Sequence, residues 1–210
     1  MPRKSIGAGT LESPLPAVMV TCGDIEGKRN IITVAWTGII NSEPPMCYVS
    51  VRRERFSHDM IRESGEFVIN LVSKELTRAM DWCGVRSGRD FDKFAETGLT
   101  PVPSEKVKCP SIEESPISLE CRVKDIKEMP THDMFMAEIV NVTVDEKLVS
   151  GSGKVDFEKA QLIASVHGGY YGLEPDPLGR FGFSVMKPKT KKRIEKQKSA
   201  ERRNRTRRRK

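Results

Sequence analysis

The chain has 210 residues, a formal net charge of +7 and 31% charged side chains. This length fits one domain with a sizeable core, and no apolar run approaches the roughly 20 residues that a membrane-spanning helix needs. The basic N-terminus lacks a following apolar block, so we expect no secretory signal. Five scattered cysteines without a CxxC pair predict reduced thiols in a cytoplasmic protein and no metal site of the zinc type.

The positive charge is concentrated at the C-terminus. Residues 187–210 contain fourteen Lys or Arg against two Glu, a formal charge of +12, which leaves −5 on residues 1–186. We therefore expect a mildly acidic domain over residues 1–186 and a basic, disordered tail over residues 187–210. The tail could contact nucleic acid or an anionic surface through counterion release, or it could dock an acidic partner protein. A solvated tail without a partner is the simpler alternative.

Short apolar and β-branched runs predict strands over residues 17–22, 31–36, 46–51 and 66–71. An arm of sixteen residues precedes the first run, and a turn rich in Gly, Asp and Lys separates the first two. Ser57 is placed to cap a helix that Gly65 ends. Ser73 is placed to cap a second helix, which would carry Leu76, Met80 and Cys83 on one face.

The second half of the domain adds longer strands. Residues 117–123 alternate between apolar and polar side chains with a period of two, which is typical of a half-buried strand, and residues 135–144 predict another. Many short strands, few helices and no regular β–helix–β alternation predict a mainly β fold, an antiparallel sheet or barrel with helical insertions. A doubly wound nucleotide-binding fold is not expected.

The loop after the strand at 46–51 has the composition of a phosphate-binding loop. It offers backbone N–H groups, arginine side chains and the start of a helix, which are the groups that hold phosphate best. The candidate contacts are Ser50, Val51, Arg52, Arg55, Phe56 and Ser57. The alternative is a solvated basic loop whose arginines pair with Glu54 and Asp59.

An apolar strand precedes this loop and could hold a flat ring. Backbone groups at a strand edge can bind the polar edge of a ring, while Trp36 and Val34 offer apolar area. The candidate residues are Thr33, Val34, Ala35, Trp36 and Thr37, with Asn30 before them. The alternative is a buried strand in which the tryptophan fills the core. The apolar strand and the basic loop together suit a ligand with a ring at one end and a phosphate at the other.

A third block, SGRDFDKF at residues 87–94, is followed by GLT at residues 98–100. A lysine close to a bound ring would stabilise a negative charge on that ring, which makes Lys93 a candidate. The alternative is a surface helix in which Asp90 and Lys93 form an exposed pair. His132 stands just before the strand at 135–144 and is the candidate catalytic residue; a histidine in a turn is otherwise most often solvated.

These blocks, in this order, resemble the flavin reductase-like proteins, a family with an FMN-binding split β-barrel. The pattern SGRDFDKF with GLT is similar to the flavoredoxin-like subgroup of that family. The resemblance covers about residues 14–185 and includes the segments EFVINL, SIEESPISLEC and GRFGF. The basic tail departs from the family pattern.

The resemblance implies an antiparallel split β-barrel homodimer that binds FMN non-covalently. NAD(P)H would donate a hydride to flavin N5, and the electrons would pass to free flavin, a ferric complex or a redox partner protein. Residues 33–36 would lie along the flavin, Lys93 would face it, and Arg89 would be a further contact. His132 would lie near the ring, where it could orient a donor or shuttle a proton.

Two alternative functions compete with that of a flavin reductase or flavoredoxin-type electron carrier. One is a nucleic-acid-binding or scaffold protein that uses the basic tail on a catalytically silent barrel, for which flavin would be irrelevant. The other is an oxidase that acts on a pyridoxal-type phosphate and shares the barrel type. Residues 33–36 and 87–94 favour the reductase branch.

Overall fold

The computed structural model describes residues 1–174, 177–179, 181–188, 190 and 193. The chain divides into two compact units, Met1–Leu173 and Glu174–Lys210. The second unit contains a 3-10 helix, η2 (Phe183–Val185). The expected domain boundary after residue 186 stays a prediction, and most of the basic tail lies outside the described residues.

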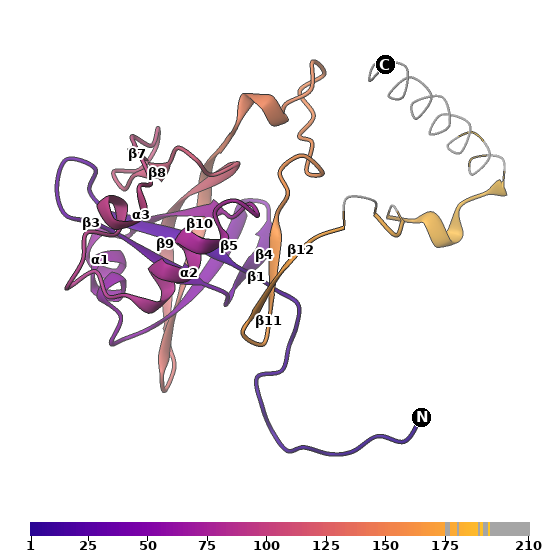
Figure 1. The fold of residues 1–210 in the computed structure, drawn as a ribbon, viewed down its shortest axis with the longest axis horizontal. Helices are drawn as coiled ribbons and strands as arrows, with labels where there is room; N and C mark the ends of the chain where they lie inside the picture. The colour runs from indigo at the N-terminus through magenta and orange to yellow at the C-terminus, as the bar shows by residue number, and fades with distance from the viewer. Residues whose placement is uncertain (175–176, 180, 189, 191–192, 194–210) are drawn as a thin grey trace. The chain divides into compact units, whose positions relative to one another are not determined.

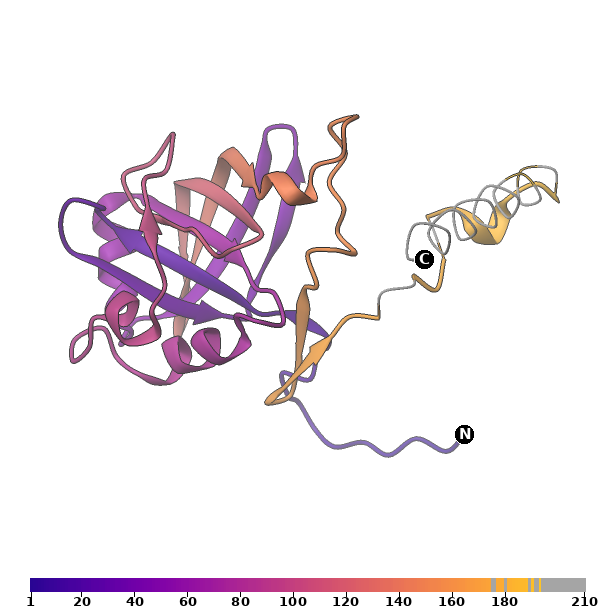
Figure 2. The same ribbon diagram turned by 45° about the horizontal axis from the view of Figure 1, so that its top comes forward.

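The first unit is built on one antiparallel sheet of seven strands that curls into a split barrel (Figures 1 and 2). The strand order is β3-β2-β6-β9-β10-β5-β4. The bounds are β2 (Val18–Gly23), β3 (Arg29–Val34), β4 (Thr37–Ser42), β5 (Pro45–Arg52), β6 (Glu66–Leu71), β9 (Ile117–Glu128) and β10 (His132–Val144). The predicted mainly β, antiparallel fold is therefore confirmed.

Two small sheets and a few short helices complete the unit. The strands β1 (Leu15–Pro16), β11 (Ile163–Val166) and β12 (Gly169–Gly172) form one sheet, and β7 (Pro101–Val102) pairs with β8 (Ser111–Ile112). The helices are α1 (Phe56–Ser64), α2 (Thr77–Val85), α3 (Lys93–Thr97) and the 3-10 helix η1 (Glu146–Leu148). All three α-helices contact β3 (Figure 1). Among the described residues, no helix is long and apolar enough to cross a bilayer.

The side chains of β2 and β3 alternate between two cores. Val20 and Ile32 belong to the core inside the barrel, with Phe67 and Phe135. Met19 and Ile31 point the other way and pack with Met80 and Phe94 under α2 and α3. Because successive residues of a strand point to opposite faces, β3 is buried on both sides and is held firmly in place.

The predicted strands coincide closely with the observed ones. The run at 66–71 matches β6, and the period-two segment at 117–123 continues to Glu128 in β9. The strand β4 was not predicted, because its side chains are mostly exposed and Ile39 and Ile40 break the alternation expected of a half-buried strand. Its neighbour β5 starts at Pro45, in a segment that indicates a turn.

Both predicted helix caps are wrong. Helix α1 has Arg55 at its N-cap position without a side-chain cap, and Ser57 is instead buried inside its first turn. Helix α2 begins at Thr77, and the Ser73 carbonyl accepts hydrogen bonds from the N–H of Leu76 and the hydroxyl of Thr77. Helix α1 therefore begins earlier than a cap at Ser57 would allow, whereas a turn closed by the Leu76 N–H and the Ser73 carbonyl delays the start of α2.

A buried carboxylate ties α1 and the loop before it to the barrel. Asp133 on β10 is fully buried and accepts hydrogen bonds from Arg53 Nε at 2.9 Å and Arg62 Nη1 at 3.3 Å. His58 Nε2 lies 2.8 Å from the same carboxylate. Burial alone would raise the pKa of Asp133, but the hydrogen bonds and charges of His58 and Arg53 outweigh it and hold the pKa below the usual range of an aspartate.

The lowered pKa of Asp133 predicts an acid-sensitive fold. A carboxyl whose pKa is lower in the folded state stabilises that state above its unfolded pKa, and the stabilisation is lost as the pH falls through the folded pKa. We expect Asp133→Asn to reduce the free energy of unfolding near neutral pH by roughly 3 kcal/mol and to flatten its decline in acid. Urea unfolding between about pH 2 and pH 6 measures both effects.

The control for this prediction is Asp125→Asn, which changes an exposed carboxyl on β9. In this variant, the free energy of unfolding should decline at acid pH as it does in the wild type. A parallel loss of stability in both variants, or an unchanged decline at acid pH in Asp133→Asn, would contradict the role assigned to the buried carboxylate.

Candidate functional site

Two adjoining pockets form a groove along β3. The α1 pocket lies at the start of α1, and the Trp36 pocket lies where β3 turns into β4; each holds about 500 Å³ of open space. Ile32 and Arg55 line both pockets. The groove therefore begins at Asn30, follows β3 to its end at Val34 and continues to Trp36.

The start of α1 gives the α1 pocket a positive end. No side chain caps this helix at Arg55, so the helix dipole remains available to an anion, while the His58 N–H of the first turn donates to the Arg55 carbonyl at 2.9 Å. Arg52 forms an exposed pair with Glu54 at 3.5 Å, whereas Arg53 turns away to Asp133. Of the arginine pairs expected of a solvated loop, the structure forms the pair of Arg52 with Glu54. Asp59 pairs with His58 and not with an arginine.

Asn30 and Ser57 connect β3 to α1 at the floor of this pocket. The Asn30 amide Nδ2 donates to Ser57 Oγ at 2.8 Å, and both residues are buried. Gly88 approaches them so closely that a Cβ there would overlap the Asn30 amide and the Phe56 ring. A glycine is thus required for the loop after α2 to close against β3.

Cations and an aromatic ring form the rim of the α1 pocket. Arg89 donates through Nη1 to the Glu54 carbonyl at 3.0 Å, and its guanidinium lies 5.5 Å from the centre of the Phe56 ring. Lys28 Nζ lies 4.5 Å from the same ring centre. These contacts hold the β5–α1 loop and the α2–α3 loop together.

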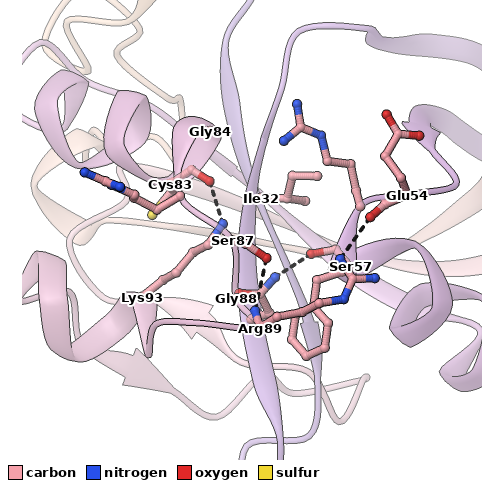
Figure 3. A pocket seen from close by; sticks show the side chains of 13 residues that line it. Ile32, Glu54, Ser57, Cys83, Gly84, Ser87, Gly88, Arg89 and Lys93 are labelled. Carbon is pink, nitrogen blue, oxygen red and sulfur yellow. Dashed lines mark hydrogen bonds between the residues drawn. The ribbon is translucent and has the colours of Figure 1, made fainter.

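Lys93 is buried inside the α1 pocket. Its Nζ donates to the Cys83 carbonyl at 2.6 Å, at the last turn of α2. Figure 3 shows the Lys93 side chain reaching towards Cys83, with Gly88 and Arg89 beside Ser57. Burial, opposed by Cys83 and reinforced by Arg55, lowers the pKa of Lys93. The surface-helix alternative is wrong, because Lys93 is buried and α3 begins at Lys93 with Asp92 as its cap.

The Trp36 pocket combines an indole, an imidazole and two arginines. Trp36 is 39% exposed, so it does not fill the core. Its ring centre lies 4.7 Å from that of His132, at an angle of 34°. Burial and then the charge of Arg52 lower the pKa of His132, because Arg52 is its partner across the strands.

The structure brings almost all of the predicted site residues to this groove. The α1 pocket is lined by Asn30, Arg55, Phe56, Ser57, Arg89 and Lys93. The Trp36 pocket is lined by Thr33, Val34, Ala35, Trp36, Ser50, Val51, Arg52, Arg55 and His132. Thr37 lies outside both pockets, where its hydroxyl donates to the Tyr48 carbonyl at 2.6 Å.

Some residues of the groove were not predicted. Ile32, Glu54, Cys83, Gly84 and Arg86 also line the α1 pocket. Gly84 offered a signal, since a glycine inside a helix often marks a close approach, and a Cβ there would lie 3.1 Å from Thr33 Cβ. Within the described part of the chain, no three His, Cys, Asp or Glu side chains gather as metal ligands would.

Comparison with known proteins identifies the family. The model of the flavin reductase like domain matches residues 11–159. Flavoredoxin of Desulfovibrio vulgaris (Miyazaki F) is 34% identical, with a TM-score of 0.81 over 88% of this chain and 100% of that chain. Flavoredoxin from Methanosarcina acetivorans is 26% identical, with a TM-score of 0.76 over the same shares.

An uncharacterized protein of Archaeoglobus fulgidus is 33% identical over 145 residues, which are 69% of this chain and 81% of the relative. The family match covers most of the barrel, including both walls of the groove along β3. The protein belongs to the flavin reductase-like domain family and has a flavin-related redox role.

Proposed function

We propose that this protein binds FMN non-covalently in the groove along β3. We further propose that it acts as an NAD(P)H-dependent flavin or ferric reductase, or as a flavoredoxin-type electron carrier. The observation that carries the proposal is the polarity of the groove. One end has an uncapped helix start with Arg55, and the other has an exposed indole.

The phosphate fits the α1 end of the groove. Phosphate binds well where backbone N–H groups, a helix dipole and arginine side chains converge. The first turn of α1, with Arg55 before it and Arg89 in the same pocket, provides this combination, and Arg52 lies in the adjoining Trp36 pocket. Ser57 is positioned by its bond with Asn30, which fixes the floor on which an anion would rest.

The ring fits the other end of the groove. From Asn30 to Val34, β3 extends about 13 Å at roughly 3.3 Å per residue, and the groove continues past the end of the strand to Trp36, so a phosphate and a ring can lie at opposite ends of one extended ligand. Trp36 and Val34 offer apolar area there, and Thr33 and Ala35 line the same pocket. Bound FMN would supply the two-electron chemistry, so no protein nucleophile is needed.

Two side chains of the chain would tune this site. Lys93 is a buried lysine that lines the α1 pocket with Ile32, one of the two residues that both pockets share, and positive charge there favours a negative charge on the cofactor. His132 has a lowered pKa, which leaves its imidazole mostly neutral at pH 7 and able to accept a proton or orient a donor.

The remaining parts of the proposal concern assembly and location. A homodimer is the arrangement that the family resemblance implies. The five cysteines are all buried and free, which supports the reducing conditions of the cytoplasm. The basic tail could contact a redox partner protein or nucleic acid. The scaffold alternative rests on that tail alone.

The visible absorption spectrum of the purified protein tests this function. We expect a two-banded flavin spectrum that bleaches on anaerobic addition of NADH or NADPH, because a reductase accepts a hydride from one of them. Bleaching with dithionite alone would favour the electron carrier, supplied by another protein. A colourless protein that takes up no added FMN would contradict the proposal.

Arginine substitutions test the phosphate end. Each charge-assisted hydrogen bond contributes roughly 1.5–3 kcal/mol, so we expect Arg55→Ala and Arg52→Ala each to weaken FMN binding by about 10-fold or more in a fluorescence titration. The matched control is Arg78→Ala, which removes the same charge from an exposed site on α2. Equal FMN affinity in all three variants would contradict the proposal that these arginines bind the phosphate of FMN.

A further inference from the structure

A third pocket adjoins the ring end of the groove. Residues 9–12 and Leu15 of the N-terminal arm line one side of it, and Trp36, Tyr48 and Met134 line the other; it holds about 850 Å³ of open space. We call it the arm pocket. It shares Trp36 and Ser50 with the Trp36 pocket, so the two are continuous around the indole.

The strand register explains this continuity. Arg52 pairs with His132, and Ser50 pairs with Met134. Because residues two apart on a strand share a face, Tyr48, Ser50 and Arg52 form one row on the outside of β5. Tyr48 lies about 7 Å further along this row than Ser50. The row therefore passes from the arginine of the Trp36 pocket to the apolar wall of the arm pocket.

The chemistry changes along the row. The Trp36 pocket contains Arg52 and Arg55, whereas Glu12 is the one charged residue among those that line the arm pocket. Aromatic rings and methionine thioethers make up much of its wall, and such groups hold flat, polarizable molecules well. A carboxylate at the edge repels anions. The lining therefore suits a neutral aromatic ring.

The arm covers one side of this pocket. It is anchored by β1, where Leu15 and Pro16 pair with Ser165 and Ala164 of β11. Residues 1–13 before this anchor contain no helix or strand, and Leu11 is still 53% exposed although it lines the pocket. A segment fixed at one end and loosely packed along its length has the properties of a lid.

We propose that the arm pocket is the subsite for a second substrate, a neutral flat ring compound, and that residues 9–12 close over it. This inference rests on the proposed function, because the subsite is defined by its position beside the ring end of the FMN groove. It names the chemical class that this end of the site accepts and the segment that covers it.

Calorimetric titration of the full-length protein with nitrobenzene tests the subsite, with and without added FMN. We expect Leu11→Ala to weaken nitrobenzene binding about 5-fold, because the ligand loses apolar contact area. The matched control is Ile6→Ala, which truncates an exposed side chain of the same arm that does not line the pocket. FMN binding should be unchanged in both variants.

A second titration uses the anion 4-nitrobenzoate. We expect the wild type to bind it more weakly than nitrobenzene, and Glu12→Gln to narrow that difference severalfold. Equal nitrobenzene affinity in Leu11→Ala and Ile6→Ala, or a preference of the wild type for the anion, would overturn the subsite. A protein that takes up no FMN, yet binds nitrobenzene with the expected dependence on Leu11, would overturn the proposed function and leave the ring selectivity standing.

Discussion

The buried carboxylate of Asp133 is the constraint on which the candidate site depends. It belongs to β10 but receives Arg53 from the loop after β5, and His58 and Arg62 from α1. A buried charge of this kind is tolerated only when it is fully paired, so the loop and the helix are held in one orientation. That orientation leaves Arg52 and Arg55 on the groove side, where an anion can reach them.

The strand β3 supplies the other fixed wall. Both of its faces pack against apolar cores, and Asn30 and Thr33 bond to α1 and α2 respectively. The groove therefore lies between rigid elements at its floor and short loops at its rim. This division is typical of binding sites, in which a stable scaffold positions loops that carry the chemistry. The arm before β1 adds the one long segment without regular structure beside the site.

Much of this arrangement could be predicted from local patterns, because strands such as β6 and β9 carry clear alternation and the loop at 50–57 concentrates cations before a helix. The helix caps could not, since backbone turns decide where α1 and α2 begin. The roles of the three neighbouring arginines were equally invisible in the sequence: Arg53 differs from Arg52 and Arg55 through its contacts with the Met129 carbonyl and with Asp133, a residue 80 positions away. The burial of Lys93 likewise depends on α2 and β3 meeting around it.

The same limit applies to the N-terminal arm. Its composition indicates an extended segment, and nothing in residues 9–12 points to Trp36 or Tyr48. Their proximity follows from the pairing of β1 with β11, two short strands far apart in the chain. Long-range pairing of this kind carries no local sequence signal, although it decides which residues share a pocket.

In the proposed site, the start of α1 and its arginines hold a phosphate while the Trp36 end of the groove holds a ring. Titration of flavin-free protein with FMN and with riboflavin separates these two contributions, because the two ligands share the ring and sugar chain and differ in the phosphate. We expect FMN to bind at least about 10-fold more tightly than riboflavin, as the loss of a charge-assisted hydrogen bond requires, and added salt to narrow this difference in affinity. Equal affinity for the two ligands would contradict the proposed site.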